Sequence, residues 1–299
     1  MTYIIENKQI KDAPWLVLLP GATAGAWLWA FSLQNITLPF NILCYNNPGV
    51  DGKPTENIRN VKDIAQDVLA DMHQFNIHKA IIQGHSLGGF VAQELALRAP
   101  DRVDKLILVS TCMGQPWLAR DFARLALNTN DYQQLVGEGE ATETGARRIL
   151  LGEKAQTERP AHIQDFIQTR AANWPRKDVR RLHTSVASHY ASAGRAHEIN
   201  QPTLVMHGAA DVLVRPASAY TLAQQLRNAR WLELAGVGHM PMIEAPDFWQ
   251  YVTDFIHDEP VGQVVKPAPP LQIPLQDQVT AASQRIRNLW QQMKQNTGL

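Results

Sequence analysis

The sequence is poor in cysteine and has no long hydrophobic run. Cys44 and Cys112 are the two cysteines in 299 residues, too few for a disulfide framework, and two thiols fit a reducing compartment such as the cytosol. No apolar run approaches the roughly 18 residues that a membrane-spanning helix needs. The first ten residues mix Glu6 and Lys8 into a short apolar patch, unlike a secretion signal. We therefore expect a cytoplasmic protein without a membrane span.

The sequence also lacks an excess of charge of either sign. It contains 28 basic and 28 acidic residues, so no overall field would attract nucleic acid or an anionic membrane surface. It has no phosphate-binding glycine motif, and His197-Glu198 lacks the second histidine at helical spacing that would suggest a zinc site. We expect no nucleic-acid partner, no metal and no cofactor.

Short apolar runs alternate with segments of helical spacing. The runs, bounded by turn residues, predict buried strands at Trp15–Leu19, Ile42–Tyr45, Ala80–Gln83, Leu106–Val109, Thr203–His207 and Trp231–Leu234. The helical segments are Val61–Phe75, Leu87–Arg98, Ala217–Leu226 and Asp247–Ile256. This alternation predicts an α/β fold, with a mostly parallel, doubly wound sheet and a site at the carboxyl ends of its strands.

The alternation stops between Gly114 and Asn200, where predicted helices follow one another without a convincing strand. An all-helical insertion between two late strands is most simply a cap, although a separate helical domain would give the same pattern. From Pro260 on, five prolines in fifteen residues predict an extended linker.

Beyond this linker, apolar residues at steps of three and four predict an amphipathic helix, whose stripe is Val279, Ala282, Ile286, Leu289 and Met293. Such a stripe would dock on its own domain, on a second copy of the chain or on another partner. The predicted organisation is a first core part at 1–113, a helical cap or lid at 114–200, a second core part at 201–259, a linker at 260–275 and a C-terminal helix at 276–299.

A serine among glycines follows one of the predicted strands. In Gly84-His85-Ser86-Leu87-Gly88 the glycines would let strand and helix approach closely, while Ser86 occupies a sharp turn that exposes its hydroxyl. A glycine turn before a helix is the simpler alternative, because a five-residue pattern also arises by chance. The remaining strand ends distinguish the two interpretations.

Two further strand ends carry an acid and a histidine. Asp211 lies in the turn after Thr203–His207, and His239 lies in a glycine-flanked loop after the last predicted strand. A serine hydroxyl needs a base to remove its proton, and the base needs an acid to orient it. The order Ser86, Asp211, His239 therefore predicts a catalytic triad.

The chain resembles the α/β-hydrolase superfamily over roughly residues 2–258. The resemblance lies in Gly84–Gly89, in Leu18-Leu19-Pro20-Gly21-Ala22, and in Gly238-His239-Met240-Pro241 with Glu244 and Pro246. It implies a sheet of about eight strands with a helical cap. It also implies an oxyanion hole made by two backbone N–H groups, here those of Leu87 and Ala22.

Two segments depart from the pattern of that superfamily. Members usually carry His-Gly where this chain has Pro20-Gly21, and a proline side chain cannot brace the loop by hydrogen bonding. The segment from Tyr45 to Pro54 keeps Pro48-Gly49 but lacks the Asp-x-x-Gly-His-Gly-x-Ser pattern common in relatives.

A serine triad with an oxyanion hole performs acyl transfer through an acyl-enzyme. We expect a carboxylesterase-like hydrolase acting on esters of small or medium apolar acyl groups. A thioesterase, a carbon–carbon bond hydrolase or an acyltransferase would use the same triad, and a non-catalytic binding or scaffold protein could share the fold. The predicted substrate-binding residues are Gly21, Trp27, Trp117, Phe122, Phe166 and Met240.

The predicted cap carries a basic stretch. Six cations face only Asp178 over 26 residues, namely Arg170, Arg176, Lys177, Arg180, Arg181 and Arg195. A solvated face is the usual meaning of such a run. The alternative is a docking surface for an acidic carrier protein, as the resemblance to carrier-protein methyl esterases with a similar capped plan implies.

Overall fold

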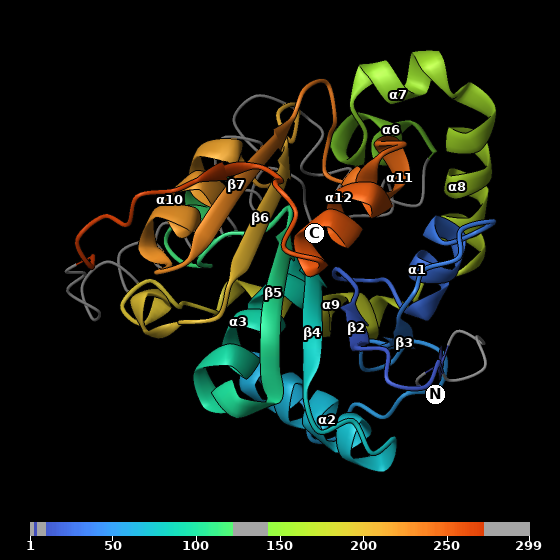
Figure 1. Ribbon diagram of the computed structural model, residues 1–299. Helices are drawn as coiled ribbons and strands as arrows, with labels where there is room; N and C mark the ends of the chain where they lie inside the picture. The colour runs from blue at the N-terminus through green and yellow to red at the C-terminus, as the bar shows by residue number, and fades with distance from the viewer. Residues whose placement is uncertain (1–2, 5–9, 122–142, 272–299) are drawn as a thin grey trace, which may run out of the picture.

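The computed structural model describes residues 3–4, 10–121 and 143–271, and its centre is an eight-stranded sheet (Figure 1). The order across the sheet is β1-β3-β2-β4-β5-β6-β7-β8. The strands are β1 Tyr3–Ile4, β2 Trp15–Leu19, β3 Asn41–Cys44, β4 Ala80–His85, β5 Val103–Val109, β6 Thr203–Gly208, β7 Ala229–Leu234 and β8 Gln263–Val264. The six inner strands are parallel, and β1 and β8 pair antiparallel at the edges. The predicted mostly parallel α/β sheet is confirmed.

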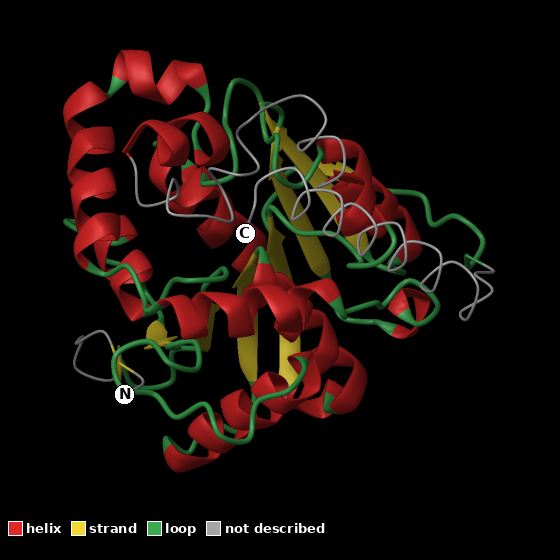
Figure 2. Cartoon of the chain, turned by 180° about the vertical axis from the view of Figure 1, so that it is seen from behind, coloured by secondary structure: helices red, strands yellow, loops and turns green. Residues whose placement is uncertain are grey.

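Helices cover both faces of the sheet, which is why β3, β4 and β6 are buried at every residue rather than alternating between buried and exposed. One buried cluster joins the sheet to α2 Val61–Gln74, α3 Leu87–Arg98 and α10 Pro216–Gln225. A second joins the other face to α1 Ala26–Ser32, α11 Pro241–Glu244 and α12 Phe248–Ile256. Figure 2 shows these two layers from behind. Within the described ranges, no helix combines the length and the apolar character needed to cross a membrane.

Four α-helices lie within residues 143–200, between β5 and β6 in the chain. They are α6 Glu143–Leu150, α7 Glu153–Glu158, α8 Pro160–Ala172 and α9 Lys177–Ser188. Helix α8 contributes Phe166 to the cluster that contains α1, whereas α9 contributes Val186 to the cluster that contains α3. The insertion is therefore packed against both layers, and Figure 1 shows α6, α7 and α8 grouped beside α11.

The segment after Pro260 is extended and lies along the core. Val261 and Val265 are buried, and the N–H of Val265 donates to the carbonyl of Ala229 at 2.9 Å. Further on, the N–H of Ala268 donates to the carbonyl of Gln224 in α10 at 2.8 Å. The chain thus stays attached to β7 and α10 as far as the described residues reach. The predicted C-terminal helix at 276–299 lies outside them.

Both cysteines lie inside the core, and neither forms a disulfide. Cys44 ends β3 and Cys112 follows β5. Burial raises the pKa of both thiols, that of Cys112 to about 12, because a thiolate would lose its hydration there.

Candidate functional site

Ser86 stands at the tight turn between β4 and α3. Its backbone is in a strained conformation, with φ of +51° and ψ of −114°. The turn depends on close backbone packing: a Cβ on Gly84 would lie 2.3 Å from the carbonyl oxygen of Gly88, and a Cβ on Gly88 2.3 Å from that of Leu19. Glycine is needed at both positions, and together they present Ser86 at the carboxyl end of the central strands.

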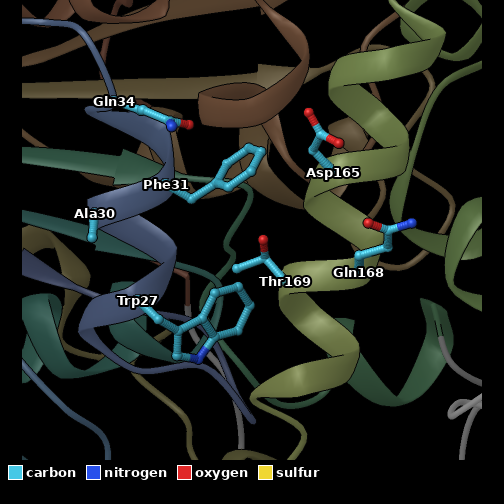
Figure 3. A pocket seen from close by; sticks show the side chains of 7 residues that line it. All are labelled: Trp27, Ala30, Phe31, Gln34, Asp165, Gln168 and Thr169. Atoms are coloured by element: carbon cyan, nitrogen blue, oxygen red, sulfur yellow. The ribbon is translucent and has the colours of Figure 1, made fainter.

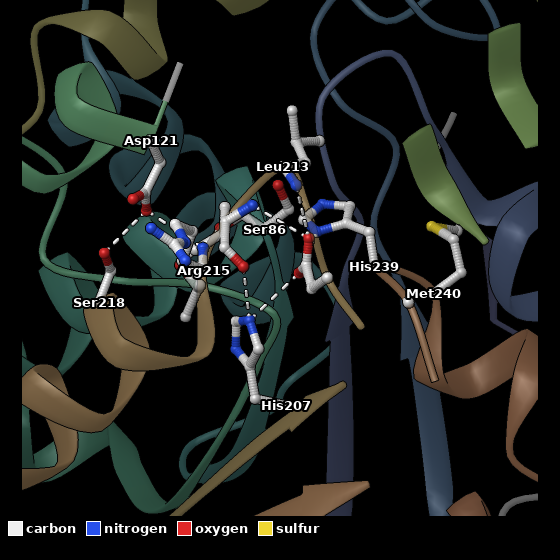
Figure 4. A network of polar contacts seen from close by, with 12 residues as sticks. Ser86, Asp121, His207, Leu213, Arg215, Ser218, His239 and Met240 are labelled. Atoms are coloured by element: carbon white, nitrogen blue, oxygen red, sulfur yellow. Dashed lines mark hydrogen bonds and ion pairs between the residues drawn. The ribbon is translucent and has the colours of Figure 1, made fainter. Parts of the chain in front are cut away.

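Asp211 and His239 meet at the same end of the sheet, in the loops after β6 and β7. The Nδ1–H of His239 donates to Oδ2 of Asp211 at 2.7 Å. This bond leaves Nε2 as the unprotonated nitrogen of a neutral His239 ring, and Figure 4 shows Ser86 beside that ring. Among the described residues, Ser86 and His239 are not joined by a hydrogen bond. Such bonds are often long before substrate binds.

Asp211 is ionised and held by four donors. Its Oδ1 accepts the N–H groups of Leu213 and Val214 at 2.9 and 3.0 Å. Its Oδ2 accepts from His239 and, at 3.1 Å, from Nε2 of His207. Burial by itself would raise the pKa of Asp211, but the two histidines outweigh it and hold that pKa well below its usual range.

His207 was not assigned a role from the sequence. It is fully buried at the end of β6, and its Nε2 also lies 2.8 Å from the carbonyl of Val214. The sequence feature that could have indicated a contact between His207 and Asp211 is their spacing of four residues. Asp121 anchors the start of α10, just beyond this loop, because its Oδ2 accepts the Ser218 hydroxyl at 2.7 Å and the Arg215 N–H at 3.1 Å (Figure 4).

His85 hydrogen-bonds the backbone of the loop that carries His239. Its Nε2–H donates to the backbone carbonyl of His239 at 2.9 Å, and the two ring centroids are 4.9 Å apart. Burial, together with the nearby His239, lowers the pKa of His85 to about 3, so this ring stays neutral. His85 therefore positions the loop that carries His239.

Glu244 clamps the His239 loop to the insertion. Its buried carboxylate accepts the N–H groups of Gly238, Met240 and, at 2.7 Å, Gly152. The N–H of His239 also donates to the carbonyl of Leu150 at 2.8 Å. Burial raises the pKa of Glu244 from its usual 4.5 to about 7, against the three donors, which favour the charged form. The insertion therefore contacts the backbone of the candidate base directly.

The two residues expected to bind an oxyanion through their N–H groups come from α3 and from the loop after β2. Leu87 is the first residue of α3, and Ala22 follows Gly21 in the loop after β2. A Cβ on Gly21 would lie 3.2 Å from the Cβ of Ser86, so this loop passes directly over the serine.

The predicted substrate-binding residues are not brought to one place. Gly21 lies near Ser86, and buried Met240 lies next to His239. Trp27 on α1 is 6.5 Å from Phe166 on α8, centroid to centroid, whereas Trp117 packs with the cluster on the other face of the sheet. Phe122 lies outside the described residues.

Trp27 does line a groove between α1 and α8, with a volume of about 570 Å³ (Figure 3). The other lining residues are Ala30, Phe31, Gln34, Asp165, Gln168 and Thr169. None of Ser86, Asp211 and His239 is among them, so the groove is separate from the candidate site. In the parts of the chain that the structure describes, no cluster of three or more histidine, cysteine, aspartate or glutamate side chains is arranged to hold a metal ion.

Comparison with known proteins agrees with this architecture. A family model for the alpha/beta hydrolase fold matches residues 14–246. A pimeloyl-[acyl-carrier protein] methyl ester esterase from Nitrosospira multiformis is 27% identical over 80% of this chain and 93% of its own length. A protein from Pseudomonas savastanoi pv. phaseolicola with the provisional name carbamate hydrolase RutD is 27% identical over 86% and 99%.

A solved structure gives the same result for the fold. The enol-lactonase from Burkholderia xenovorans LB400 superimposes with a TM-score of 0.71 at 23% identity, covering 86% of this chain and 96% of that enzyme. This similarity supports the arrangement of sheet and helices.

Proposed function

Because the chain belongs to the alpha/beta hydrolase family, whose similar members act on esters or related bonds, we propose that it is a serine hydrolase that cleaves a carboxylic ester. Its substrate carries a small or medium apolar acyl group. Ser86 is the nucleophile, His239 the general base and Asp211 the acid that orients it.

The reaction proceeds in two halves. His239 Nε2 takes the proton of Ser86 as Oγ attacks the ester carbonyl, and the positive ring is stabilised by the ionised Asp211. The N–H groups of Leu87 and Ala22 bind the developing oxyanion, each contributing on the order of 3 kcal/mol to the transition state. His239 then protonates the leaving alcohol, and water, activated by the same ring, releases the acid from the acyl-enzyme.

The observation that carries the proposal is the 2.7 Å bond from His239 to Asp211, at the end of the sheet where the strained Ser86 stands. A buried carboxylate on Nδ1 fixes the tautomer that a base needs.

The test is hydrolysis of p-nitrophenyl acetate and butyrate by the wild type and by Ser86→Ala. We expect activity that the substitution abolishes, and a fluorophosphonate probe that adds its mass to Ser86 alone. Equal background rates together with no labelling of Ser86 would reject the proposal.

The acyl group is proposed to be apolar because buried apolar side chains adjoin the triad residues, namely Leu87 directly after Ser86 and Met240 directly after His239. Thioesters and carbon–carbon bonds cleaved next to a carbonyl would use the same groups. A matched panel of an ester, a thioester and an amide with one butyryl group separates these reactions by their kcat/KM values.

A second candidate is the methyl ester of an acyl group attached to an acidic carrier protein. One relative carries that name, and in the insertion here the guanidinium groups of Arg170 and Arg180 lie over the Trp174 ring, 4.0 and 5.3 Å from its centroid. Several of these cations also have partners within the chain: Arg195 pairs with buried Glu94 at 3.0 Å, Arg176 pairs with Asp178, and Arg180 donates to the carbonyl of Pro175 at 2.8 Å.

The carrier candidate predicts that one methyl ester is hydrolysed faster on an acyl carrier protein than on free pantetheine, and that added salt removes the difference. Reversing Arg180 and Arg181 to Glu should remove it too. A rate advantage that survives both changes would exclude a basic docking surface.

We further propose a cytoplasmic location, and association through the segment beyond residue 271, with a second copy or another partner. Comparing the solution mass of the whole chain with that of a chain ending at residue 271 tests the oligomer. An unchanged mass would exclude oligomerisation through the tail.

A further inference from the structure

The buried side chain of Asn47 donates hydrogen bonds to the loop that carries Ala22. Asn47 Nδ2 donates to the carbonyl of Gly21 at 2.7 Å and to that of Ala24 at 3.0 Å, with a longer contact of 3.3 Å to Pro20. Asn47 is 1% exposed, so these bonds have no competition from bulk water. One amide group thus holds three carbonyls of one short turn.

The hydrogen bond from Asn47 to the Gly21 carbonyl fixes the direction of the Ala22 N–H. The Gly21 carbonyl and the Ala22 N–H belong to one planar trans peptide, in which they point in opposite directions. A bond that holds the carbonyl toward Asn47 therefore holds the Ala22 N–H away from it. This N–H is the one proposed to bind the oxyanion.

The next peptide, between Ala22 and Thr23, is hydrogen-bonded by a side chain of the insertion. The Thr23 N–H donates to Nδ1 of His183 at 2.9 Å, and Nε2–H of His183 donates to the carbonyl of Pro48 at 2.8 Å. His183 lies on α9 and is fully buried. With one nitrogen accepting and the other donating, the ring is neutral and its tautomer is fixed. Its pKa is lowered, because burial disfavours the charged ring.

Thr23 needs such a restraint. Its φ of +67° is a conformation that branched side chains rarely adopt, so the turn would relax if it were not held. The bonds of Asn47 and His183 act on the two peptides that flank Ala22. Both sets of bonds connect to the loop after β3, because Asn47 lies in that loop and His183 donates to the carbonyl of its neighbour Pro48.

We propose that Asn47 and His183 are positioning residues that together orient the Ala22 N–H toward the oxyanion. Asn47 provides the bracing hydrogen bond that Pro20 cannot make, and His183 joins the brace to the insertion, so that a displaced α9 would disorganise the oxyanion loop. This inference rests on the proposed serine hydrolase function.

Two matched pairs of variants test the brace. Asn47→Asp keeps the shape of the side chain but replaces the donor by an acceptor, whereas Asn47→Gln keeps a donor. His183→Asn keeps an acceptor close to the position of Nδ1, whereas His183→Gln keeps a donor close to that of Nε2 and loses the bond to Thr23. Exposed His189, at the end of the same helix, supplies the control His189→Gln.

We expect kcat for p-nitrophenyl butyrate to fall roughly 10- to 100-fold in Asn47→Asp and in His183→Gln, with little change in KM, because the loss is confined to the transition state. Affinity for a boronic-acid transition-state analogue should fall in parallel. His183→Asn should retain more kcat than His183→Gln, and His189→Gln should match the wild type.

The outcomes separate the brace from the function on which it rests. A wild type whose activity does not depend on Ser86 would reject the serine hydrolase. Activity that depends on Ser86 but is equal in His183→Asn and His183→Gln, with both folded by circular dichroism, would overturn the role of Nδ1. If Asn47→Asp does not fold, the comparison within the His183 pair still decides the proposal.

Discussion

At the scale of single residues, the candidate site depends on side chains that hold other groups in place. Asp211 illustrates this, because one carboxylate accepts from two histidines and two backbone N–H groups. A buried charge of this kind is tolerated only when its partners are complete. His207, which is fully buried, completes this set of partners.

Replacing Asp211 by Asn should leave the fold intact and lower kcat. An amide at this position can donate to His239 Nδ1, which favours the wrong tautomer of the base. We expect kcat for p-nitrophenyl butyrate to fall roughly 1,000- to 10,000-fold with little change in KM. Steady-state kinetics with a folding control by circular dichroism measures this. A variant that retains a tenth of wild-type kcat would exclude Asp211 as the orienting acid.

Glu244 should make stability depend on pH. Its pKa is raised on folding, so the folded chain binds this proton more tightly than the unfolded chain, and the stabilisation is present at low pH and lost as pH rises from about 4.5 to 7. Relative to Glu244→Gln, the wild type should lose on the order of 3 kcal/mol of unfolding free energy across that window. Urea unfolding of both proteins at several pH values measures the difference. A constant difference would contradict a raised pKa.

At the scale of elements, the backbone of the insertion packs directly against the backbone of the His239 loop. The two backbones are so close that no side chain fits between them. A Cβ on Gly152 would lie 2.1 Å from the carbonyl oxygen of Gly236, and a Cβ on Gly238 2.6 Å from the Gly152 nitrogen. Gly152 is the N-cap residue of α7. A shift of that helix would therefore displace the loop that carries the candidate base.

Gly152→Ala should therefore destabilise the chain by about 1–3 kcal/mol and lower kcat, because the added methyl group must push two backbones apart. Gly194, also in the insertion, is the matched control, since a Cβ there would meet nothing within 4 Å. Thermal unfolding and ester hydrolysis of both variants give the comparison. Equal behaviour of the two variants would show that the contact does not constrain the loop.

The strand ends were predictable from sequence, and the contacts between loops were not. Ser86, Asp211 and His239 were found because each follows a short apolar run, and parallel strands bring such positions to one edge. Asn47 and His183 gave no comparable signal, and Glu244 was visible only as part of the resemblance, with no role attached to it. Their partners include groups 26, 160 and 92 residues away in the chain, respectively, and which loops meet is decided by tertiary packing.

The edges of the sheet show the same limit. Strands β1 and β8 have two residues each, too short for a pattern of period two to be recognised. The bounds of β2 and α3 were predicted to the residue because apolar runs and turn residues coincide there.

At the scale of the whole molecule, the extended segment after Pro260 is part of the folded unit. It adds buried Val261 and Val265 and a strand to the outer edge of β7. A chain ending at residue 271 should keep this layer, whereas one ending at residue 260 exposes the edge of the sheet.

We expect the shorter chain to lose about 3–4 kcal/mol of unfolding free energy relative to the chain ending at 271, the contribution of two buried valines at roughly 1.5–2 kcal/mol each. Urea unfolding of the two truncated proteins measures the difference. Equal midpoints would mean that the segment adds nothing to the core.

The two buried thiols offer a way to time the opening of this molecule. A reagent such as an alkylating iodoacetamide attacks thiolate, and in the closed state neither sulfur is ionised or within reach. Each alkylation event therefore records a transient exposure of the interior. Because Cys44 ends β3 and Cys112 lies in the segment after β5, the ratio of their modification rates tells whether the two regions open together or separately.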